Sequence, residues 1–140
     1  MTATVTTIVP PRGLKPRTVR LGAEIARTTV RVRRLLRHHD LPTALERCRD
    51  VVPSRATARP DDVRRLSRAV RRTLGVLPGD SRCLVSSLVL ITVLTRRGLA
   101  ASLVIGVRPG KALGAHAWVE VDGRPALPAA RDKFAHLVTL

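Results

Sequence analysis

The sequence predicts an α+β protein in which a group of helices precedes a small antiparallel sheet. In the first half of the chain, apolar residues recur at spacings of three and four, as they do on one side of a helix. Residues 84–95 then form an uncharged run, and beyond Gly98 apolar residues alternate with a period of two. Because helical and strand-like segments occupy separate parts of the chain, we expect an α+β fold rather than alternating α/β units.

We divide the 140 residues into three regions. Residues 1–17 hold three prolines and a glycine without periodicity, and we expect a flexible N-terminal arm there. Residues 18–58 are predicted to form a basic helical region. Residues 59–140 form the third region. A chain of 140 residues has room for a single modest core.

Three helices are expected before residue 75. The apolar side of residues 21–36 predicts a first helix that begins at Thr18 and ends at His38-His39-Asp40. Residues 42–51 form a short second helix. Asp61-Asp62 places negative charge where the dipole of a third helix favours it. The buried stripe of that third helix consists of Val63, Leu66, Val70 and Leu74.

The fourth helix is expected to be central. Residues 75–80 form a turn-rich connection, and Ser81 is a suitable N-cap, so Cys83 falls in the first turn. Residues 84–94 are apolar on nearly every face, which predicts burial on all sides. Gly98 follows two arginines, as expected of a glycine that ends a helix.

Three antiparallel strands are expected after this helix. Residues 101–107 and 115–121 have the composition and alternation of strands. Asp122-Gly123 is a strong signal for a two-residue hairpin turn, so residues 124–127 return as a third strand.

The net charge of +16 is large, with 26 basic and 10 acidic residues. Such a balance commonly indicates nucleic-acid binding. The basic residues are almost all Arg, however, and the chain has one Trp, one Phe and no Tyr on which bases could stack. We therefore consider nucleic acid an unlikely partner, and an acidic or amphipathic peptide explains a positive surface at least as well.

Several classes of protein are disfavoured by the sequence. The longest uncharged apolar run is shorter than the roughly 20 residues that span a bilayer. The N-terminus lacks basic residues ahead of an apolar stretch, unlike a signal peptide. Cys48 and Cys83 lie far apart without a CxxC motif, which argues against a zinc site or a disulfide framework. We expect a cytoplasmic protein without a membrane partner, a metal or a cofactor.

Cys83 is the candidate nucleophile. A thiolate, rather than a thiol, attacks carbonyl carbon, and the unpaired N–H groups of a helix's first turn favour the anion. The same N–H groups can bind the oxyanion that forms during attack. The competing interpretation is that Cys83 simply packs in a core, as free cysteines commonly do. Cys48 lacks a comparable setting, and we interpret it as structural.

His116 is the candidate base. Strand alternation puts His116, Trp118 and Glu120 on one face of residues 115–121, and this is not the composition of an ordinary core face. An imidazole beside a thiol can take its proton, so Cys83 and His116 together suit acyl transfer. A structural role for His116 remains the alternative. His38, His39 and His136 have no matching context.

Three segments carry a specific resemblance: residues 81–88, 96–107 and 115–123, which read SRCLVSSL, RRGLAASLVIGV and AHAWVEVDG. In order, spacing and glycines they resemble the transglutaminase-like cysteine peptidases that mature lasso peptides, which are related to the microcin-processing leader peptidase. The resemblance covers about residues 60–127. It implies a transglutaminase-like, papain-like fold whose catalytic core is residues 59–140, and catalytic roles for Cys83 and His116.

The resemblance also implies a function and partners. Such a peptidase removes the leader from a ribosomally made lasso precursor peptide, and a separate lasso cyclase then closes the macrolactam. The chain is too short to include a fused leader-recognition domain. It is therefore similar to the stand-alone form, which acts with a leader-recognition protein. A related acyltransferase or amidase on the same fold, or a basic binding or scaffold module, are the alternatives.

The third catalytic residue is the point of departure from the family. The family's Asp falls at Pro128 in this sequence, and no carboxylate occupies the neighbouring positions. Asp132 and Glu120 are weak candidates to replace it. Asp122 suits the hairpin turn better and lies at the wrong end of the strand. The sequence therefore predicts a Cys–His dyad or an incomplete triad.

Overall fold

The computed structural model describes residues 13, 15–55, 57–79, 83–108, 114–126 and 135–140. Within them the chain forms helices α1 to α4 and a four-stranded antiparallel sheet, so the predicted α+β class is confirmed. The helices come first in the chain and the strands follow, as the change of apolar period indicates.

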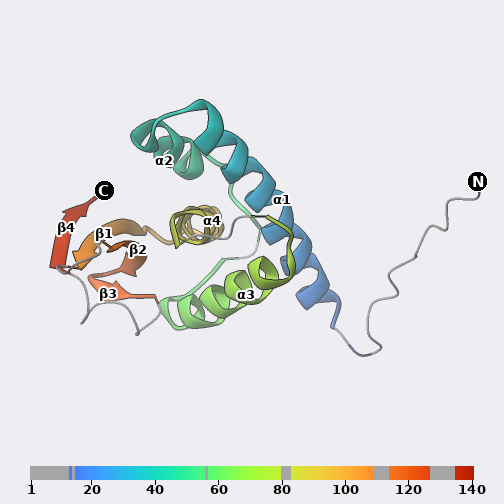
Figure 1. Ribbon diagram of the computed structural model, residues 1–140. Coiled ribbons are helices and arrows are strands. Elements are labelled where there is room, and N and C mark those ends of the chain that lie inside the picture. Colours follow the sequence, from blue (N-terminus) through green and yellow to red (C-terminus); the bar gives the residue numbers. More distant parts are fainter. Residues whose placement is uncertain (1–12, 14, 56, 80–82, 109–113, 127–134) are drawn as a thin grey trace, which may run out of the picture.

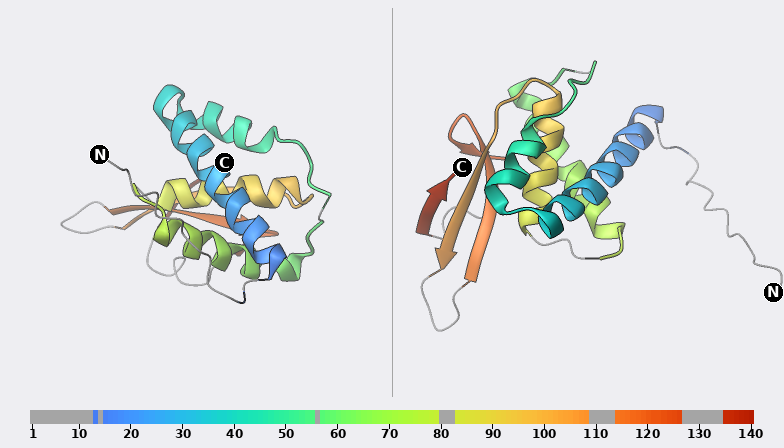
Figure 2. Two further views of the ribbon diagram at one scale, coloured as in Figure 1. Left: turned by 90° about the vertical axis from the view of Figure 1, so that its right-hand side faces the viewer. Right: turned by 90° about the horizontal axis from the view of Figure 1, so that it is seen from above.

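Helix α4 (Cys83–Arg96) lies at the centre of the molecule. Figure 1 shows it almost end-on, with the sheet on one side and the other helices around it. Contacts join α4 to α1 (Pro16–His38), α2 (Leu41–Arg49), α3 (Val63–Val76) and two strands of the sheet. The views in Figure 2 agree that α4 is enclosed by these elements. The uniformly apolar sequence of α4 is explained by this position.

The helix ends differ from the predicted ones by one or two residues. Helix α1 begins at Pro16 rather than Thr18, because proline is well accommodated in the first turn of a helix. The predicted N-terminal arm lies mostly outside the described residues. Helix α2 ends at Arg49 rather than at Val51. Helix α3 follows a short 3-10 turn (Pro60–Asp62) and continues past its predicted end to Val76.

Helix α4 ends as its glycine predicts. Gly98 has a φ of +83°, a conformation that side chains with a Cβ rarely adopt. The N–H of Gly98 donates to the carbonyl of Thr95, and the N–H of Leu99 donates to the carbonyl of Leu94. These two bonds form a Schellman motif, which satisfies carbonyls that the helix leaves unpaired.

The sheet has the strand order β3-β2-β1-β4. Strands β1 (Ser102–Arg108) and β2 (Gly114–Val121) pair in antiparallel register from Ser102 opposite Glu120 to Arg108 opposite Gly114, as predicted for an antiparallel sheet. Asp122 and Gly123 both have positive φ, which is the type I′ turn favoured by Asp-Gly. Strand β3 is shorter than expected (Arg124–Pro125), although the N–H of Ala126 still donates to the carbonyl of Val119.

Strand β4 (Ala135–Thr139) was not predicted from the sequence. It pairs with β1 and forms one edge of the sheet. Its residues include Leu137, which is 63% exposed. Leu137 and Val138 are adjacent apolar residues, so the sequence of this strand does not show the alternation of apolar and polar residues by which a strand is recognised.

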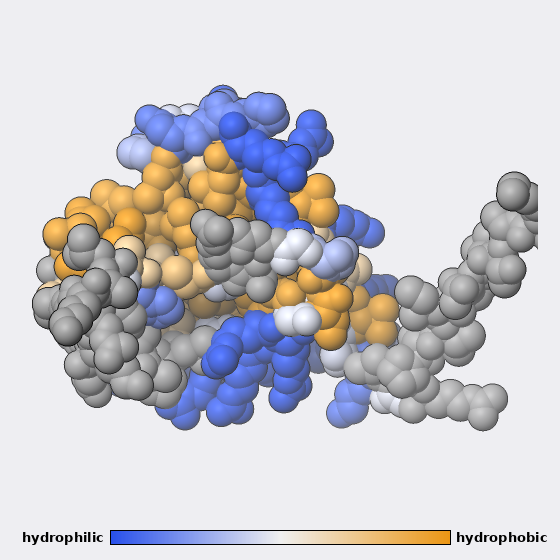
Figure 3. Space-filling view, in the orientation of Figure 1, coloured by the Kyte–Doolittle hydropathy of each residue, from blue (hydrophilic) through white to orange (hydrophobic). Residues whose placement is uncertain are grey.

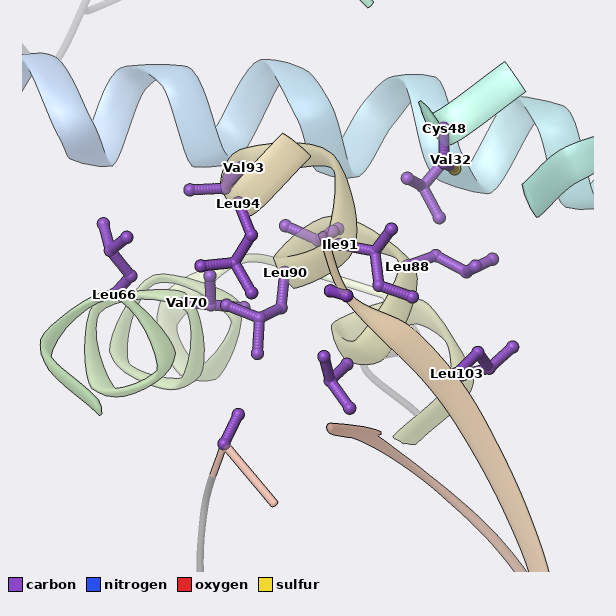
Figure 4. Packing of buried hydrophobic residues seen from close by; sticks show 14 of the residues in the cluster. Val32, Cys48, Leu66, Val70, Leu88, Leu90, Ile91, Val93, Leu94 and Leu103 are labelled. Carbon is purple, nitrogen blue, oxygen red and sulfur yellow. The ribbon is translucent and has the colours of Figure 1, made fainter. Parts of the chain in front are cut away.

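The core is aliphatic and centred on α4 (Figure 4). Leu88, Val89, Ile91, Val93 and Leu94 are completely buried. They contact a cluster drawn from every helix and from the sheet, including Ile25, Leu45, Leu66, Val70 and Leu103. Burying a side chain of this size stabilises the fold by about 2 kcal/mol.

A charged cluster joins α1 to the end of α4. The carboxylate of Glu24 accepts hydrogen bonds from both terminal nitrogens of Arg97, at 2.9 and 2.7 Å, and from Arg96 at 3.1 Å. Burial raises the pKa of Glu24, but the hydrogen bond from Arg97 and the charges of Arg97 and Arg96 outweigh it and hold the pKa below its ordinary value. The carboxylate is thus kept ionised by its two partners.

None of the described helices combines the length and the apolar character that crossing a bilayer requires.

Candidate active site

Cys83 is the first residue of α4 and is half-buried. Its Sγ accepts a hydrogen bond from the backbone N–H of Ala117 on strand β2, with 3.4 Å between sulfur and nitrogen. One turn further along α4, the hydroxyl of Ser87 donates to the carbonyl of the same Ala117, at 3.3 Å. Two contacts therefore fasten the beginning of α4 to a single residue of β2.

The side chains of β2 divide between two environments, as the predicted alternation requires. Ala117, Val119 and Val121 belong to the core cluster beneath α4. His116 and Trp118 belong to the other set, and their rings stack with centroids 6.2 Å apart and planes inclined at 24°. Offset stacking at this separation is a favourable aromatic geometry.

Trp118 connects His116 to a carboxylate. The indole is 7% exposed, and its Nε1–H donates to Oε1 of Glu120 at 3.0 Å. His116 itself is half-buried. Glu120, which the sequence suggests as a weak third member of the site, thus contacts Trp118, and the stacked indole links it to the imidazole.

Cys83 and His116 are brought to neighbouring positions, although 33 positions separate them in the chain. The peptide N–H bound by Sγ directly follows His116, so it is covalently attached to the carbonyl carbon of that residue. This proximity depends on the packing of α4 against β2, which no local sequence pattern encodes. The hydrogen bond brings the Cys83 thiol to the backbone beside His116, whereas the imidazole of His116 belongs to the other face of β2, where it stacks on Trp118. A thiol and a backbone N–H donor are in contact, and both have roles in acyl transfer by cysteine.

The second cysteine has a different environment. Cys48 is completely buried in the core between α2 and its neighbours. Burial raises the pKa of the Cys48 thiol, and this outweighs the opposing effects of Thr92 and of nearby arginines. A buried neutral thiol is a poor nucleophile, so Cys48 is structural, as its sequence context suggests.

Of the other proposed third residues, Asp122 alone lies within the described part of the chain. Pro128 and Asp132 lie outside the described residues, and so does the predicted N-cap Ser81. Asp122 is exposed in the hairpin turn, at the opposite end of β2 from His116. At about 3.3 Å per residue, the six positions between them correspond to roughly 20 Å.

Sequence reasoning missed two features beside the site. One is the backbone of Ala117, whose N–H and carbonyl both contact α4. The other is His136, which the register of β4 places opposite Gly106, while Gly106 is in turn opposite His116. The sequence did not predict β4. It therefore could not predict that the positions of His116 and His136 lie in one row across the sheet.

Within the described residues, no three His, Cys, Asp or Glu side chains gather in a group that could hold a metal ion.

Comparisons with known proteins identify the family. The family model described as the transglutaminase-like superfamily matches residues 25–139, which span α1 to β4. No curated protein and no solved structure matches the chain. The superfamily includes cysteine peptidases and acyltransferases and is typically enzymatic. Since the match covers most of the sequence and includes Cys83 and His116, the chain belongs to the transglutaminase-like superfamily.

Proposed function

We propose that this protein is a cysteine peptidase that removes the leader from a ribosomally synthesised lasso precursor peptide. The observation that chiefly supports it is the contact between Sγ of Cys83 and the N–H of Ala117, the residue next to His116. Superfamily membership supports cysteine-dependent chemistry. The resemblance of residues 81–88, 96–107 and 115–123 to lasso leader peptidases supports the narrower substrate.

In the first half of the proposed reaction, His116 takes the proton of the Cys83 thiol. The thiolate attacks the carbonyl carbon at the leader–core junction, and a tetrahedral intermediate forms with its negative charge on oxygen. As the carbon–nitrogen bond breaks, the imidazolium of His116 gives its proton to the leaving amine. The core peptide departs with a free N-terminus, and the leader remains on Cys83 as a thioester.

In the second half, water replaces the amine. His116 removes a proton from water, hydroxide attacks the thioester carbon, and the carbon–sulfur bond breaks. The leader leaves with a new carboxylate. The proton held by His116 then returns to the thiolate or passes to solvent, so atoms and charge balance over the cycle.

Two contacts assist this chemistry. The N–H of Ala117 donates to sulfur and so fixes the position of the nucleophile against β2. The stack of His116 on Trp118, itself anchored to Glu120, restricts the orientation of the imidazole. In the proposed site Trp118 is therefore a positioning residue, and it does part of the work that an Asp does in a Cys–His–Asp triad.

The proposed setting is a biosynthetic pathway in the cytoplasm. A leader-recognition protein presents the precursor, this peptidase cuts it, and a separate lasso cyclase joins the freed N-terminus to an acidic side chain. No cofactor or metal takes part in the proposed cleavage.

The test is cleavage of the precursor with purified leader-recognition protein, followed by mass spectrometry. We expect Cys83→Ala to abolish leader removal and to leave the fold intact, because the side chain is small and half-buried. Cys48→Ala is the matched control, since it removes the other thiol and is expected to retain cleavage. Leader removal by the Cys83→Ala variant would exclude the proposed nucleophile.

An acyltransferase of the same superfamily would use the same residues, and the products distinguish the two. A peptidase releases the leader as a carboxylic acid, whereas a transferase joins it to an added amine. The mass of the leader after incubation with excess hydroxylamine or a primary amine, in comparison with buffer alone, decides between them.

A further inference from the structure

A groove lined by arginines runs between α1 and α3. It has a volume of about 470 Å³, and Arg17 of α1 and Arg64, Arg65, Arg68 and Arg72 of α3 line it. We call it the arginine groove. All five side chains are exposed, and Figure 3 shows the hydrophilic surface that covers α3 in this view.

The charge of the groove is nearly uncompensated within the described residues. Asp61 also lines it, and Arg65 forms an exposed ion pair with Asp62 at 3.4 Å. Among the described residues, no ion pair involves Arg17, Arg64, Arg68 or Arg72. Like charges three or four residues apart on a helix destabilise it, so a negatively charged occupant would relieve a repulsion that the free protein carries.

The floor of the groove is apolar. Leu21 and Ala69 line it and pack against the core. None of the described residues that line the groove has an aromatic side chain on which a base could stack. An apolar floor between cationic walls suits a polypeptide with acidic and aliphatic residues better than it suits a nucleic acid.

The lining of the groove follows α3 from Arg64 to Arg72. Arg65 and Leu66, near the start of α3, line the same cavity as Arg97 beyond the end of α4, so the two helices run antiparallel. Arg72 is therefore near the end of the pair at which Cys83 begins α4. Allowing 1.5 Å per helical residue and 8–10 Å between helix axes, Arg68 lies roughly 15–20 Å from Cys83, which about five or six extended residues can bridge.

We propose that the arginine groove docks an acidic segment of the polypeptide substrate, about five or more residues from the bond that Cys83 cleaves. The proposal rests on the proposed function only for the identity of the cleaved bond. Docking itself needs no thiol. It deepens the assignment by naming a substrate-binding surface on this chain, separate from any that a partner protein supplies.

Fluorescence anisotropy with the Cys83→Ala protein tests the proposal without turnover. The probe is a fluorescein-labelled synthetic peptide of alternating Glu and Leu residues, compared with the same peptide carrying Gln in place of Glu. We expect the Glu peptide alone to bind. We expect the combined change Arg64→Ala, Arg68→Ala and Arg72→Ala to weaken its affinity roughly tenfold, and added salt to weaken it further.

The matched control changes Arg27, Arg34 and Arg37 of α1 to Ala. These residues are equally exposed, and their removal lowers the net charge by the same amount. We expect the control to bind as the parent does.

Equal weakening by both variants would show that net charge alone causes the effect and would overturn the proposal. The absence of any binding of the Glu peptide would also overturn it. Labelled duplex DNA that outcompetes the Glu peptide would assign the groove to nucleic acid instead. Precursor cleavage by the groove variant in the Cys83-containing protein is measured separately, so failure of docking and failure of the peptidase assignment are distinguishable.

Discussion

The two ends of α4 are held in the fold by different means. At the C-terminal end, Glu24 binds both Arg96 and Arg97, and the N–H of Ser54 donates to the carbonyl of Arg96 at 2.7 Å. The Schellman motif at Gly98 adds further hydrogen bonds. At the N-terminal end, the contacts with β2 in the described residues are the neutral ones from Ala117 to Cys83 and from Ser87 to Ala117.

The contacts that stabilise α4 and the candidate nucleophile therefore lie at opposite ends of the same helix. Ion pairs and a capping motif fix the C-terminal end, and the apolar core fixes the middle. The N-terminal end is consequently able to keep a half-buried thiol that is held by a hydrogen bond from the backbone of Ala117. We expect substitutions at the two ends to change different measurable quantities.

The largest expected effect is on the reactivity of Cys83. Without His116 no neighbouring imidazole takes the thiol proton, so we expect His116→Gln to slow alkylation of Cys83 by iodoacetamide roughly hundredfold at neutral pH. Labelling of each cysteine is followed by peptide mass spectrometry. His38→Gln, an exposed histidine at the end of α1, is the control and should leave the rate unchanged. An unaltered rate in the His116 variant would disprove the pairing of thiol and imidazole.

Substitution at the C-terminal end of α4 should change the free energy of unfolding. Glu24→Ala leaves two arginines without their carboxylate, and since Arg96 is one-third exposed we expect a loss of about 2–3 kcal/mol in the free energy of unfolding, below the cost of breaking a fully buried pair. Urea denaturation of the reduced protein measures it. Glu46→Ala removes an exposed carboxylate of α2 and should cost less than about 0.5 kcal/mol. Equal losses in the two variants would show that the cluster at Glu24 contributes nothing special.

The ion pairs of Glu24 with Arg96 and Arg97 should also make the stability of the protein depend on pH in the acid range. Because the folded pKa of Glu24 is held below its ordinary value, its stabilising effect is complete above the unfolded pKa and is lost as the pH falls through the folded pKa. Between about pH 5 and about pH 3, wild type should therefore lose more stability than Glu24→Gln, which has no proton to gain there. If wild type and Glu24→Gln lost the same amount of stability, groups other than Glu24 would account for the sensitivity to acid.

The smallest effect is expected at Trp118. An aromatic stack is worth about 0.5–1.5 kcal/mol, so Trp118→Leu should slow Cys83 alkylation several-fold and alter its pH profile. Trp118→Phe keeps a ring beneath His116 and should restore most of the rate, although it loses the bond to Glu120. If Leu and Phe behaved alike, the stack would have no part in orienting the imidazole.

The sequence predicts those parts of the fold that depend on local patterns. The helices follow from apolar spacing, the hairpin follows from Asp122-Gly123, and the end of α4 follows from Gly98. The division of β2 into two faces follows from alternation, and that alternation also groups His116 with Trp118.

The rest depends on contacts between distant segments. Strand β4 is held by pairing with β1. Its apolar residue Leu137 is exposed, so the apolar pattern of the sequence does not mark this segment as a strand. The hydrogen bond from Ala117 to Cys83 is donated by a backbone N–H, which every residue except proline has. The residue type at position 117 therefore does not predict this bond. The bond between Trp118 and Glu120 needs a particular rotamer of each side chain, which packing selects.

Trp118 is the only tryptophan in the chain, and there is no tyrosine. Its indole ring stacks on His116, so the intrinsic emission of the whole protein originates beside the candidate base. A protonated imidazole quenches indole fluorescence by contact, whereas a neutral one does so weakly. The protein consequently carries a built-in optical reporter, through which the ionisation of His116 and the arrival of a substrate can be followed without any label.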